Sequence, residues 1–514
     1  MKEPDDRLRI LAAVGVPAIL AAILTLIEIS GRSLGFDEGA SVAIAAQHGG
    51  ALSSAIAHDG GNMSGYYLLL HVLIGLFGNG TFAIRLPSAI CIAATAALTS
   101  VIALRLFGAG VAFAAGLLTA VSLPLVFWAQ DARGYAPMVA LATASFLAFV
   151  YLVEDERPTR RAWIAYFLTT TLAAYCGFIV VLIVPAQLVM LYWRRQAITA
   201  VASALAASAV CWIPLVVLAL RRGSGQLFWV PHLSLSLEKQ MLEALTSAGL
   251  EPSFRATSTM WALMIVTVAI VAAVAVGHVR RSARPAFGHR TELWGQALVL
   301  LWLIVPVALA FVESLAAQPI FIARNLLMCL PAVALLLAVG IADRRLPAAA
   351  TVAALAALIA LRALALGPSY GVSPENWRAA SSYVLTRSQP GDCTAFYPLD
   401  ARVAFEYYAG QSARSLARAP RSVLPVIRWG VVKPYVEDYA TLSPAQVSAV
   451  AGGCRRLWLI TSHEGQLHGP SSRSRSNWFG YIALRAALER AYREHDRVQF
   501  GYAATIHVDL LSGP

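Results

Sequence analysis

The sequence predicts a polytopic α-helical membrane protein of about eleven transmembrane helices, followed by a small α/β domain at the carboxyl end. Three observations lead to this prediction. Apolar stretches of about 17–24 residues recur up to residue 366, and each is long enough to cross about 30 Å of hydrocarbon. Only 13% of the residues are charged, whereas a soluble domain carries about a quarter. After residue 366, short β-like runs alternate with amphipathic helical runs.

The predicted membrane spans follow one another closely. They cover about 10–29, 83–106, 110–128, 135–152, 162–177, 179–193, 197–220, 258–277, 293–312, 325–341 and 347–366. Two longer stretches, about 30–82 and about 221–257, separate spans from one another. The first stretch contains Tyr66–Phe77, which is apolar but short for a span, and we interpret it as an amphipathic or re-entrant piece.

Short arginine clusters between the spans predict how the chain is threaded. They comprise Arg157, Arg160, Arg161, Arg194, Arg195, Arg280, Arg281, Arg284, Arg344 and Arg345. Cytoplasmic loops are enriched in such residues. We therefore predict a multi-pass protein of the plasma (inner) membrane with a cytoplasmic N-terminus. Loops 30–82 and 221–257 and the C-terminal domain are then extracytoplasmic.

The net charge of +12 does not predict a nucleic-acid-binding protein. The basic excess lies in the clusters between spans, and the sequence contains no basic stripe with interleaved aromatic residues. The expected partners of these charges are membrane lipids.

Residues 367–514 are predicted to form a soluble extracytoplasmic α/β domain, which is large enough to bury its own core. Short strands are expected at Cys393–Tyr397, Leu457–Thr461 and Tyr502–Leu510, and helices at Pro374–Thr386 and Tyr481–Arg493. Cys393 and Cys454 each stand just before a predicted strand. If those strands are neighbours, a disulfide can form in the oxidising space outside the cell.

Ionisable residues gather at the predicted outer face of the membrane. They are Asp37, Glu38, Asp59, Asp131, Arg133, Glu313 and Arg324, with Asn62 nearby. Such groups are costly near bilayer depth and are therefore candidates for function. Acids beside arginines could hold an anionic lipid head group while one carboxylate activates an acceptor hydroxyl.

Each of these residues also has a purely structural interpretation. The pair Asp37 and Glu38 could begin a solvated loop helix, and Asp59 and Asn62 could form a turn beside two glycines. The arginines could be anchors to lipid phosphates, and the Tyr66-Tyr67 pair could belong to an aromatic belt at the interface. For Arg85, just before Pro87, a structural role is favoured.

Four motifs in order resemble a known family over about residues 10–340. They are Phe36-Asp37-Glu38-Gly39-Ala40-Ser41, Tyr66-Tyr67 with Arg85-Leu86-Pro87-Ser88, Gln130-Asp131-Ala132-Arg133-Gly134-Tyr135, and Pro319-Ile320-Phe321-Ile322-Ala323-Arg324-Asn325-Leu326. Together they resemble the protein O-mannosyltransferase-like enzymes of the glycosyltransferase C superfamily, which include the bacterial aminoarabinose transferases.

This resemblance implies that residues 1–366 form a glycosyltransferase domain of the glycosyltransferase C type, whose first outer loop, about 30–82, is catalytic. It implies a polyprenyl-phosphate sugar donor, transfer at the outer face and inversion at the sugar carbon. Asp37 matches the catalytic base, with Glu38 beside it, and Arg133 and Arg324 match ligands of the donor phosphate.

We expect Asp59, Asn62 and Tyr66 to contact the acceptor or the sugar. The acceptor hydroxyl could belong to a protein, a lipid or a polysaccharide, and the sugar could be mannose, arabinose, galactose or an amino sugar. His58 and His71 have no third ligand at a metal-binding spacing, so no protein-ligated metal is predicted. A divalent cation shared between carboxylates and phosphate stays open, and no other cofactor is expected.

The alternative prediction is a transporter or flippase of lipid-linked glycans. Transporters commonly show internal repeats and paired broken helices near the midplane, and the sequence shows neither. A third interpretation is a sensor whose outer domain binds a glycan or a protein.

Overall fold

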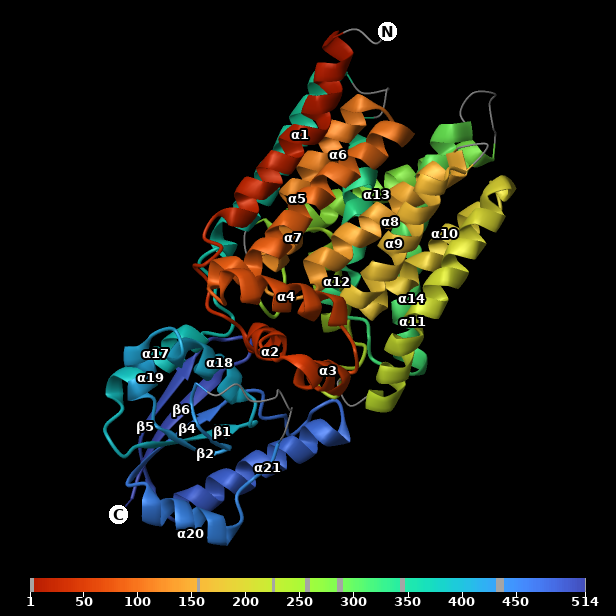
Figure 1. The fold of residues 1–514 in the computed structure, drawn as a ribbon. Coiled ribbons are helices and arrows are strands. Elements are labelled where there is room, and N and C mark those ends of the chain that lie inside the picture. The colour runs from red at the N-terminus through yellow and green to blue at the C-terminus, as the bar shows by residue number, and fades with distance from the viewer. Residues whose placement is uncertain are drawn as a thin grey trace.

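The computed structural model describes residues 4–154, 158–223, 227–254, 259–283, 290–342, 347–430 and 439–513. A bundle of long apolar helices occupies one part, and a sheet-containing domain lies beyond one end of it (Figure 1). The bundle contains α1 (Pro4–Leu26), α5 (Thr81–Leu106), α6 (Ala109–Ala120), α7 (Leu123–Ala129), α8 (Tyr135–Glu154), α9 (Arg160–Cys176), α10 (Val184–Leu191), α11 (Ile198–Arg222), α13 (Met260–Ser282), α14 (Arg290–Ala316), α15 (Leu330–Ile341) and α16 (Ala348–Leu366).

All eleven predicted spans are helical, but not all of them are full length. Within the described ranges, eight helices are long and apolar enough to cross a membrane, and a ninth span results if α6 and α7, bent by 55°, are counted as one. The predicted count of about eleven also included α9, with 17 residues, and the 14-residue segment Phe178–Leu191. At 1.5 Å per residue α9 is only about 26 Å long, which is shorter than the hydrocarbon core.

The bend between α6 and α7 is stabilised from a neighbouring helix. Pro124 in the first turn of α7 favours a new helix start there. The last carbonyl groups of α6 then lose their partners within the helix. Arg362 of α16, which is buried, donates a hydrogen bond of 2.7 Å to the Leu118 carbonyl.

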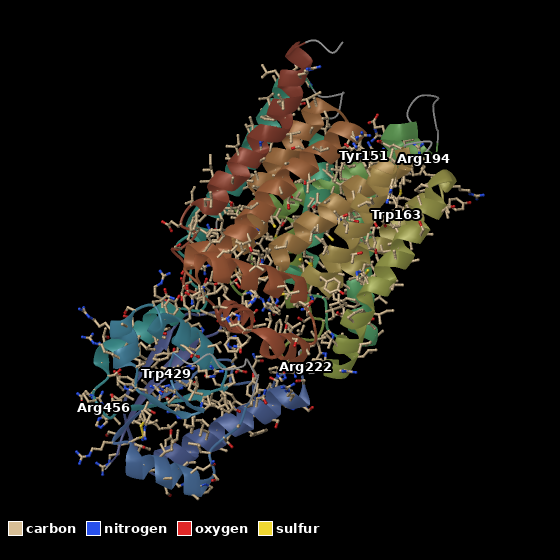
Figure 2. The ribbon with its side chains drawn as sticks, viewed as in Figure 1. Tyr151, Trp163, Arg194, Arg222, Trp429 and Arg456 are labelled. Carbon is tan, nitrogen blue, oxygen red and sulfur yellow. A yellow bond between two sulfur atoms is a disulfide. The ribbon has the colours of Figure 1, made fainter. Side chains whose placement is uncertain are left out.

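The arginine clusters that predicted the threading are only partly described. Arg157, Arg284, Arg344 and Arg345 lie outside the described residues. Arg194 lies at the end of the bundle away from the sheet domain, whereas Arg222 lies near α3 at the other end (Figure 2).

Three short helices fill the predicted first outer loop. They are α2 (Phe36–Ala45), α3 (Gly49–His58) and α4 (Ser64–Phe77), and all lie at the end of the bundle that faces the sheet domain (Figure 1). At the N-terminus of α2, the Glu38 carboxylate accepts a hydrogen bond from the N–H of Gly35, the residue that precedes the helix.

The C-terminal domain contains a six-stranded mixed sheet of order β3-β2-β1-β4-β6-β5. Its strands are β1 (Cys393–Tyr397), β2 (Arg421–Leu424), β3 (Val426–Ile427), β4 (Arg456–Thr461), β5 (Arg493–Phe500) and β6 (Ile506–Ser512), and its helices are α17 (Trp377–Arg387), α18 (Ala401–Ala409), α19 (Ala413–Arg418), α20 (Pro444–Gly453) and α21 (Ser472–Glu489). Both faces of β4 are buried, because Leu457 and Leu459 join one core cluster while Trp458 and Ile460 join another. The predicted α/β domain is confirmed.

Strand β5 was not predicted, because its sequence is mostly charged and polar. It pairs with β6 alone, at the edge of the sheet. Charged side chains are common on edge strands, where they discourage pairing with other chains.

The sheet domain packs closely on the first outer loop. Helix α18 lies against α2, so close that a Cβ atom on Gly39 would be 3.2 Å from the Ala404 backbone. The Tyr408 hydroxyl accepts a hydrogen bond of 2.6 Å from the Leu34 N–H. Arg378 donates to the carbonyl groups of Gly31 and Ser30. Helix α2 is therefore held between the helix bundle and the sheet domain.

Cys393 and Cys454 form a disulfide across 61 residues of sequence, as the positions of the two strands allowed. A loop of this length should stabilise the folded chain by about 4 kcal/mol, through the entropy lost from the unfolded state. The double variant Cys393→Ser/Cys454→Ser should therefore unfold at a lower temperature in a thermal scan of the purified full chain. The control is Cys91→Ser/Cys211→Ser, which changes two free thiols. Equal unfolding temperatures of both double variants and the wild type would contradict this expectation.

Candidate active site

Asp37 is the centre of a charged cluster at the start of α2. Its Oδ2 atom lies 3.0 Å from Arg324 Nη1 and 3.9 Å from Arg133 Nη2. The three side chains come from α2, from the turn between α7 and α8, and from the 3₁₀ segment Ala323–Cys329. The Asp37 side chain is 43% exposed, so it can be reached from outside the protein.

Arg133 is held in place by neutral oxygen atoms as well as by Asp37. Its Nη1 donates to the Asp37 carbonyl, to Ser41 Oγ and to the Tyr67 hydroxyl at 3.3–3.4 Å. The next residue, Gly134, lies so close to α9 that a Cβ atom would be 2.2 Å from the Cys176 carbonyl oxygen. The buried Nε of Arg133 has no hydrogen-bond partner among the described residues.

Arg324 is covered by aromatic rings. Its guanidinium carbon lies 4.4 Å from the centre of the Trp229 ring and 5.8 Å from that of Tyr135. Stacking on a ring leaves the N–H groups at the edge of the guanidinium plane directed at other partners. One of them bonds Asp37.

Glu38, predicted beside the catalytic base, is buried in an ion pair with Arg85. The two side chains form two parallel hydrogen bonds of 2.7 and 2.6 Å, and Glu38 also accepts from the Ala132 N–H at 2.9 Å. Arg85 donates further to the carbonyl groups of Ile29 and Ser33. This geometry aligns α2 with the turn that carries Arg133, and it leaves Glu38 no position next to a substrate.

The three residues predicted to contact acceptor or sugar have different surroundings. The Asp59 carboxylate accepts a hydrogen bond of 2.9 Å from the Tyr67 hydroxyl, which links it to Arg133. Asn62 accepts from the Phe178 N–H, and the buried Tyr66 donates to the Ile84 carbonyl. Of these three, Asp59 alone is joined to the Asp37 cluster by hydrogen bonds between described residues.

The pKa values of the Asp37 and Asp59 carboxyl groups are shifted in opposite directions. Burial alone would raise the pKa of Asp37, but the guanidinium groups of Arg133 and Arg324 outweigh it and lower the pKa to about 2. Burial raises the pKa of Asp59 to about 6, although Arg133 and the Tyr67 hydroxyl act in the opposite direction. Asp37 is therefore ionised at any physiological pH, whereas Asp59 titrates just below neutrality.

Several members of the cluster were not predicted as site residues. Tyr67 links Asp59 to Arg133, Trp229 covers Arg324, and Glu375 and His463 of the sheet domain approach the start of α2. The aromatic run around Trp229 in the second outer loop, and the polar residues directly after β4, were the signals available in the sequence. Among the described residues no group of three His, Cys, Asp or Glu could hold a metal ion.

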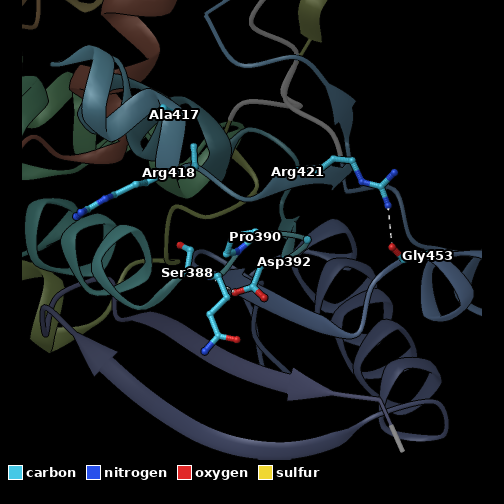
Figure 3. Close-up of a pocket in the computed structure, with 10 residues that line it drawn as sticks. Ser388, Pro390, Asp392, Ala417, Arg418, Arg421 and Gly453 are labelled. Carbon is cyan, nitrogen blue, oxygen red and sulfur yellow. Dashed lines mark hydrogen bonds between the residues drawn. The ribbon is translucent and has the colours of Figure 1, made fainter.

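A surface cavity of about 410 Å³ lies in the sheet domain, away from this cluster (Figure 3). Its lining includes Asp392, Arg418 and Arg421, at the amino ends of β1 and β2. His463 instead follows the carboxyl end of β4, which runs parallel to β1. The cavity is therefore at the opposite end of the strands, and we assign it no part in the chemistry of Asp37.

A protein-family model matches a segment that includes the end of the first outer loop and part of the helix bundle. Residues 64–220 match the family model described as dolichyl-phosphate-mannose-protein mannosyltransferase. The resemblance to the mannosyltransferase family is confirmed over this segment. The predicted class of enzyme, a membrane glycosyltransferase that uses a lipid-phosphate sugar, agrees with this mannosyltransferase match. No curated protein sequence matches the chain.

Solved structures share the fold. The archaeal oligosaccharyltransferase AglB from Archaeoglobus fulgidus, in complex with an inhibitory peptide and a dolichol-phosphate, is 13% identical with a TM-score of 0.54, over 97% of this chain and 74% of that chain. The Archaeoglobus fulgidus oligosaccharyltransferase in complex with Zn and sulfate is 12% identical with a TM-score of 0.52, over 96% and 72%. ArnT from Cupriavidus metallidurans bound to undecaprenyl phosphate is 13% identical with a TM-score of 0.43, over 97% and 98%. The oligosaccharyltransferase matches confirm the predicted multi-pass helical fold.

Glu38→Gln should destabilise the chain by about 3–5 kcal/mol, because it leaves the Arg85 charge buried without its partner. Burial alone would raise the pKa of Glu38, but Arg85 outweighs it and lowers the pKa. The stability that this carboxylate contributes is therefore present above pH 4.5 and is lost as the pH falls through the lowered pKa. Thermal unfolding of the purified protein measures both effects.

Glu154→Gln is the matched control, because Glu154 pairs with Arg105 at the surface. Such a pair contributes about 0–1 kcal/mol. If the Glu38 and Glu154 variants lost the same stability, Glu38 would not be the anchor of α2.

Proposed function

We propose that this protein transfers a sugar from a polyprenyl-phosphate donor to an acceptor hydroxyl at the outer face of the plasma membrane, with inversion at the sugar carbon. Residues 1–366 are the membrane-embedded catalytic part, loop 30–82 carries the base, and residues 367–514 form the extracytoplasmic domain. The observation that carries this proposal is one exposed carboxylate, Asp37, beside two guanidinium groups at one end of the helix bundle.

The arginines suit the leaving group of this reaction. When the bond between the sugar carbon and the phosphate oxygen breaks, polyprenyl phosphate departs with additional negative charge on its oxygens. Guanidinium groups stabilise that charge through paired hydrogen bonds and do not titrate. The guanidinium groups of Arg133 and Arg324, which already face the carboxylate of Asp37, are suited to bind it.

Asp37 suits the base. The acceptor oxygen forms its bond to the sugar carbon while its proton moves to the Asp37 carboxylate, and the phosphate leaves from the opposite side. A phosphate monoester needs no acid to leave, so one carboxylate is sufficient, in contrast to the two carboxyl groups of glycosidases. Glu38 then acts as a positioning residue and not as a proton carrier.

Donor binding should also activate the base. Without a donor, Asp37 is paired with Arg324 and its pKa is about 2, so it attracts a proton only weakly. A donor phosphate competes for the same guanidinium groups and neutralises part of their charge. The pKa of Asp37 then rises, so the carboxylate becomes a better base only when a donor is present.

The class of donor and the side of the membrane are supported by separate observations. The structural relative AglB was solved with a dolichol-phosphate and an inhibitory peptide, which supports a polyprenyl-phosphate donor and a protein acceptor, while lipid and polysaccharide acceptors stay open. Arg194 lies at the far end of the bundle from the sheet domain (Figure 2), which supports a cytoplasmic position for that end. A divalent cation between carboxylate and phosphate is also left open.

Asp37→Asn should reduce sugar transfer at least about 100-fold, because the base is lost. The same variant should bind undecaprenyl phosphate more tightly than the wild type, because both arginines lose a competing anion. Arg324→Gln should bind it more weakly, and Arg221→Gln, at the exposed end of α11, should be unchanged.

Transfer is measured with labelled undecaprenyl-phosphate mannose, arabinose, galactose and amino-sugar donors and an envelope extract, followed by mass spectrometry of the products. Binding of undecaprenyl phosphate is measured on the purified proteins. Normal transfer by the Asp37 variant would reject the assigned base. Movement of lipid-linked sugar across liposomes without an acceptor would favour the flippase alternative.

Wild-type activity should rise as the pH passes about 6, because the ionised Asp59 carboxylate holds Tyr67 and, through it, Arg133. Below that pH Asp59 is protonated and this support is weakened. Asp59→Asn should show low activity without the inflection near pH 6, and Tyr67→Phe should behave in the same way. An unchanged inflection in the Asp59 variant would assign the titration to another group.

A further inference from the structure

The loop that follows β4 brings a histidine to the start of α2. The ring of His463 lies 4.9 Å, centre to centre, from that of Phe36, the residue before Asp37. One oxygen of Glu375 lies 3.5 Å from His463 Nε2, and the other accepts a hydrogen bond of 2.6 Å from the Phe36 N–H. Glu375 therefore joins the histidine to the first turn of the helix that carries Asp37.

His463 is held at the surface in an unusual backbone conformation, and its Nδ1 pairs with the Ser462 hydroxyl at 2.9 Å. Its φ of 57° lies in the left-handed region, which residues other than glycine rarely adopt. Its side chain is 35% exposed, so it does not fill a core. The next residue, Glu464, bonds Thr461 and His507 at 2.5 and 3.0 Å, which makes the loop rigid. Backbone strain of this kind is often retained at functional sites.

His463 is electrostatically coupled to Asp37. Burial alone would lower the pKa of His463, but Glu375 and, more weakly, Asp37 and Glu464 raise it. The histidine in turn lowers the pKa of Asp37, after Arg133 and Arg324. These acidic groups favour the imidazolium form of His463.

The direction from which His463 approaches Asp37 indicates which part of the substrate it can contact. Arg133 and Arg324 belong to the helix bundle, whereas His463 belongs to the sheet domain, and α2 lies between the two (Figure 1). In an inverting displacement the leaving phosphate and the acceptor oxygen are on opposite faces of the sugar carbon. If the arginines hold the phosphate, the acceptor has to arrive on the side of Asp37 that faces His463.

We propose that His463 is a positioning residue that the sheet domain adds to the active site, where it orients the acceptor hydroxyl toward Asp37 while Glu375 holds it in place. This inference rests on the proposed function. It gives the C-terminal domain a direct part in acceptor binding. Its ligand is an oxygen of the acceptor. Because Nδ1 pairs with the Ser462 hydroxyl at 2.9 Å, the N–H that can bind this oxygen by a charge-assisted hydrogen bond is Nε2, whose contact with Glu375 is 3.5 Å long.

The first test measures the coupling without any substrate. The full chain carrying ¹³C-labelled histidine is titrated by NMR, and the His463 signal is identified by its loss in His463→Gln. Its pKa should be above 6.5 and should fall in both Asp37→Asn and Glu375→Gln. His468→Gln, an exposed histidine five residues further on, should leave it unchanged. A His463 pKa that is indifferent to Asp37→Asn would overturn the proposal.

The second test separates acceptor positioning from donor use. With undecaprenyl-phosphate mannose as donor, His463→Gln should lower transfer to an envelope extract about tenfold, while hydrolysis of the donor by water stays within about twofold. His463→Lys, which keeps a cation, should recover part of the transfer and extend it to higher pH. If transfer and hydrolysis fell by the same factor in the His463 variants and in Glu375→Gln, these residues would have only a structural role. That result would overturn the proposal.

The two tests also separate this inference from the proposed function. If the wild type used none of the four sugar donors, the proposed function would fail, while the titration would still report whether His463 faces Asp37. If the wild type transferred sugar and His463→Gln did so equally well, the inference alone would fail.

Discussion

The ion pair between Glu38 and Arg85 is the interaction on which the site depends. It joins the start of α2 to α5, and its hydrogen bonds reach the chain that leaves α1 and the turn before α8. Four segments that are distant in sequence are therefore brought to one point by two side chains. A buried pair of this kind contributes little net stability compared with apolar side chains, but it specifies one arrangement, because any other leaves a charge without a partner.

Asp37 and Glu38 are neighbours in sequence and have opposite surroundings. Glu38 is fully occupied by Arg85 and by backbone N–H groups, and it cannot exchange partners without loss of the fold. The Asp37 side chain is 43% exposed, and those of its partners Arg133 and Arg324 are 13% and 24% exposed. One turn of helix thus carries both a permanent ion pair and an exchangeable one, and a ligand anion can replace only the second.

Much of the arrangement could be predicted from the sequence, because hydropathy and arginine clusters order the spans and place Asp37, Arg133 and Arg324 at the same end of the bundle. The partner of Glu38 could not be predicted, since Arg85 is 47 residues away and the pairing depends on how α2 packs. Tyr66 and Tyr67 are adjacent and both buried, yet only Tyr67 reaches the charged cluster. Glu375 and His463 could not be predicted either, because they reach α2 only through the packing of the separate sheet domain. Hydropathy predicted about eleven spans, whereas eight or nine helices of the described residues are long enough to cross a membrane, because hydropathy does not measure where a short helix ends.

The position of α2 between two parts of the molecule has a consequence for how the protein matures. The helix is made near the beginning of synthesis, but Ala404, Tyr408 and Glu375, which contact it or the segment before it, are made more than 300 residues later. During translation Asp37 is therefore made long before the domain that packs on α2. The contacts on both sides of α2 are therefore complete only after the sheet domain has been made and has folded against a helix from the opposite end of the chain.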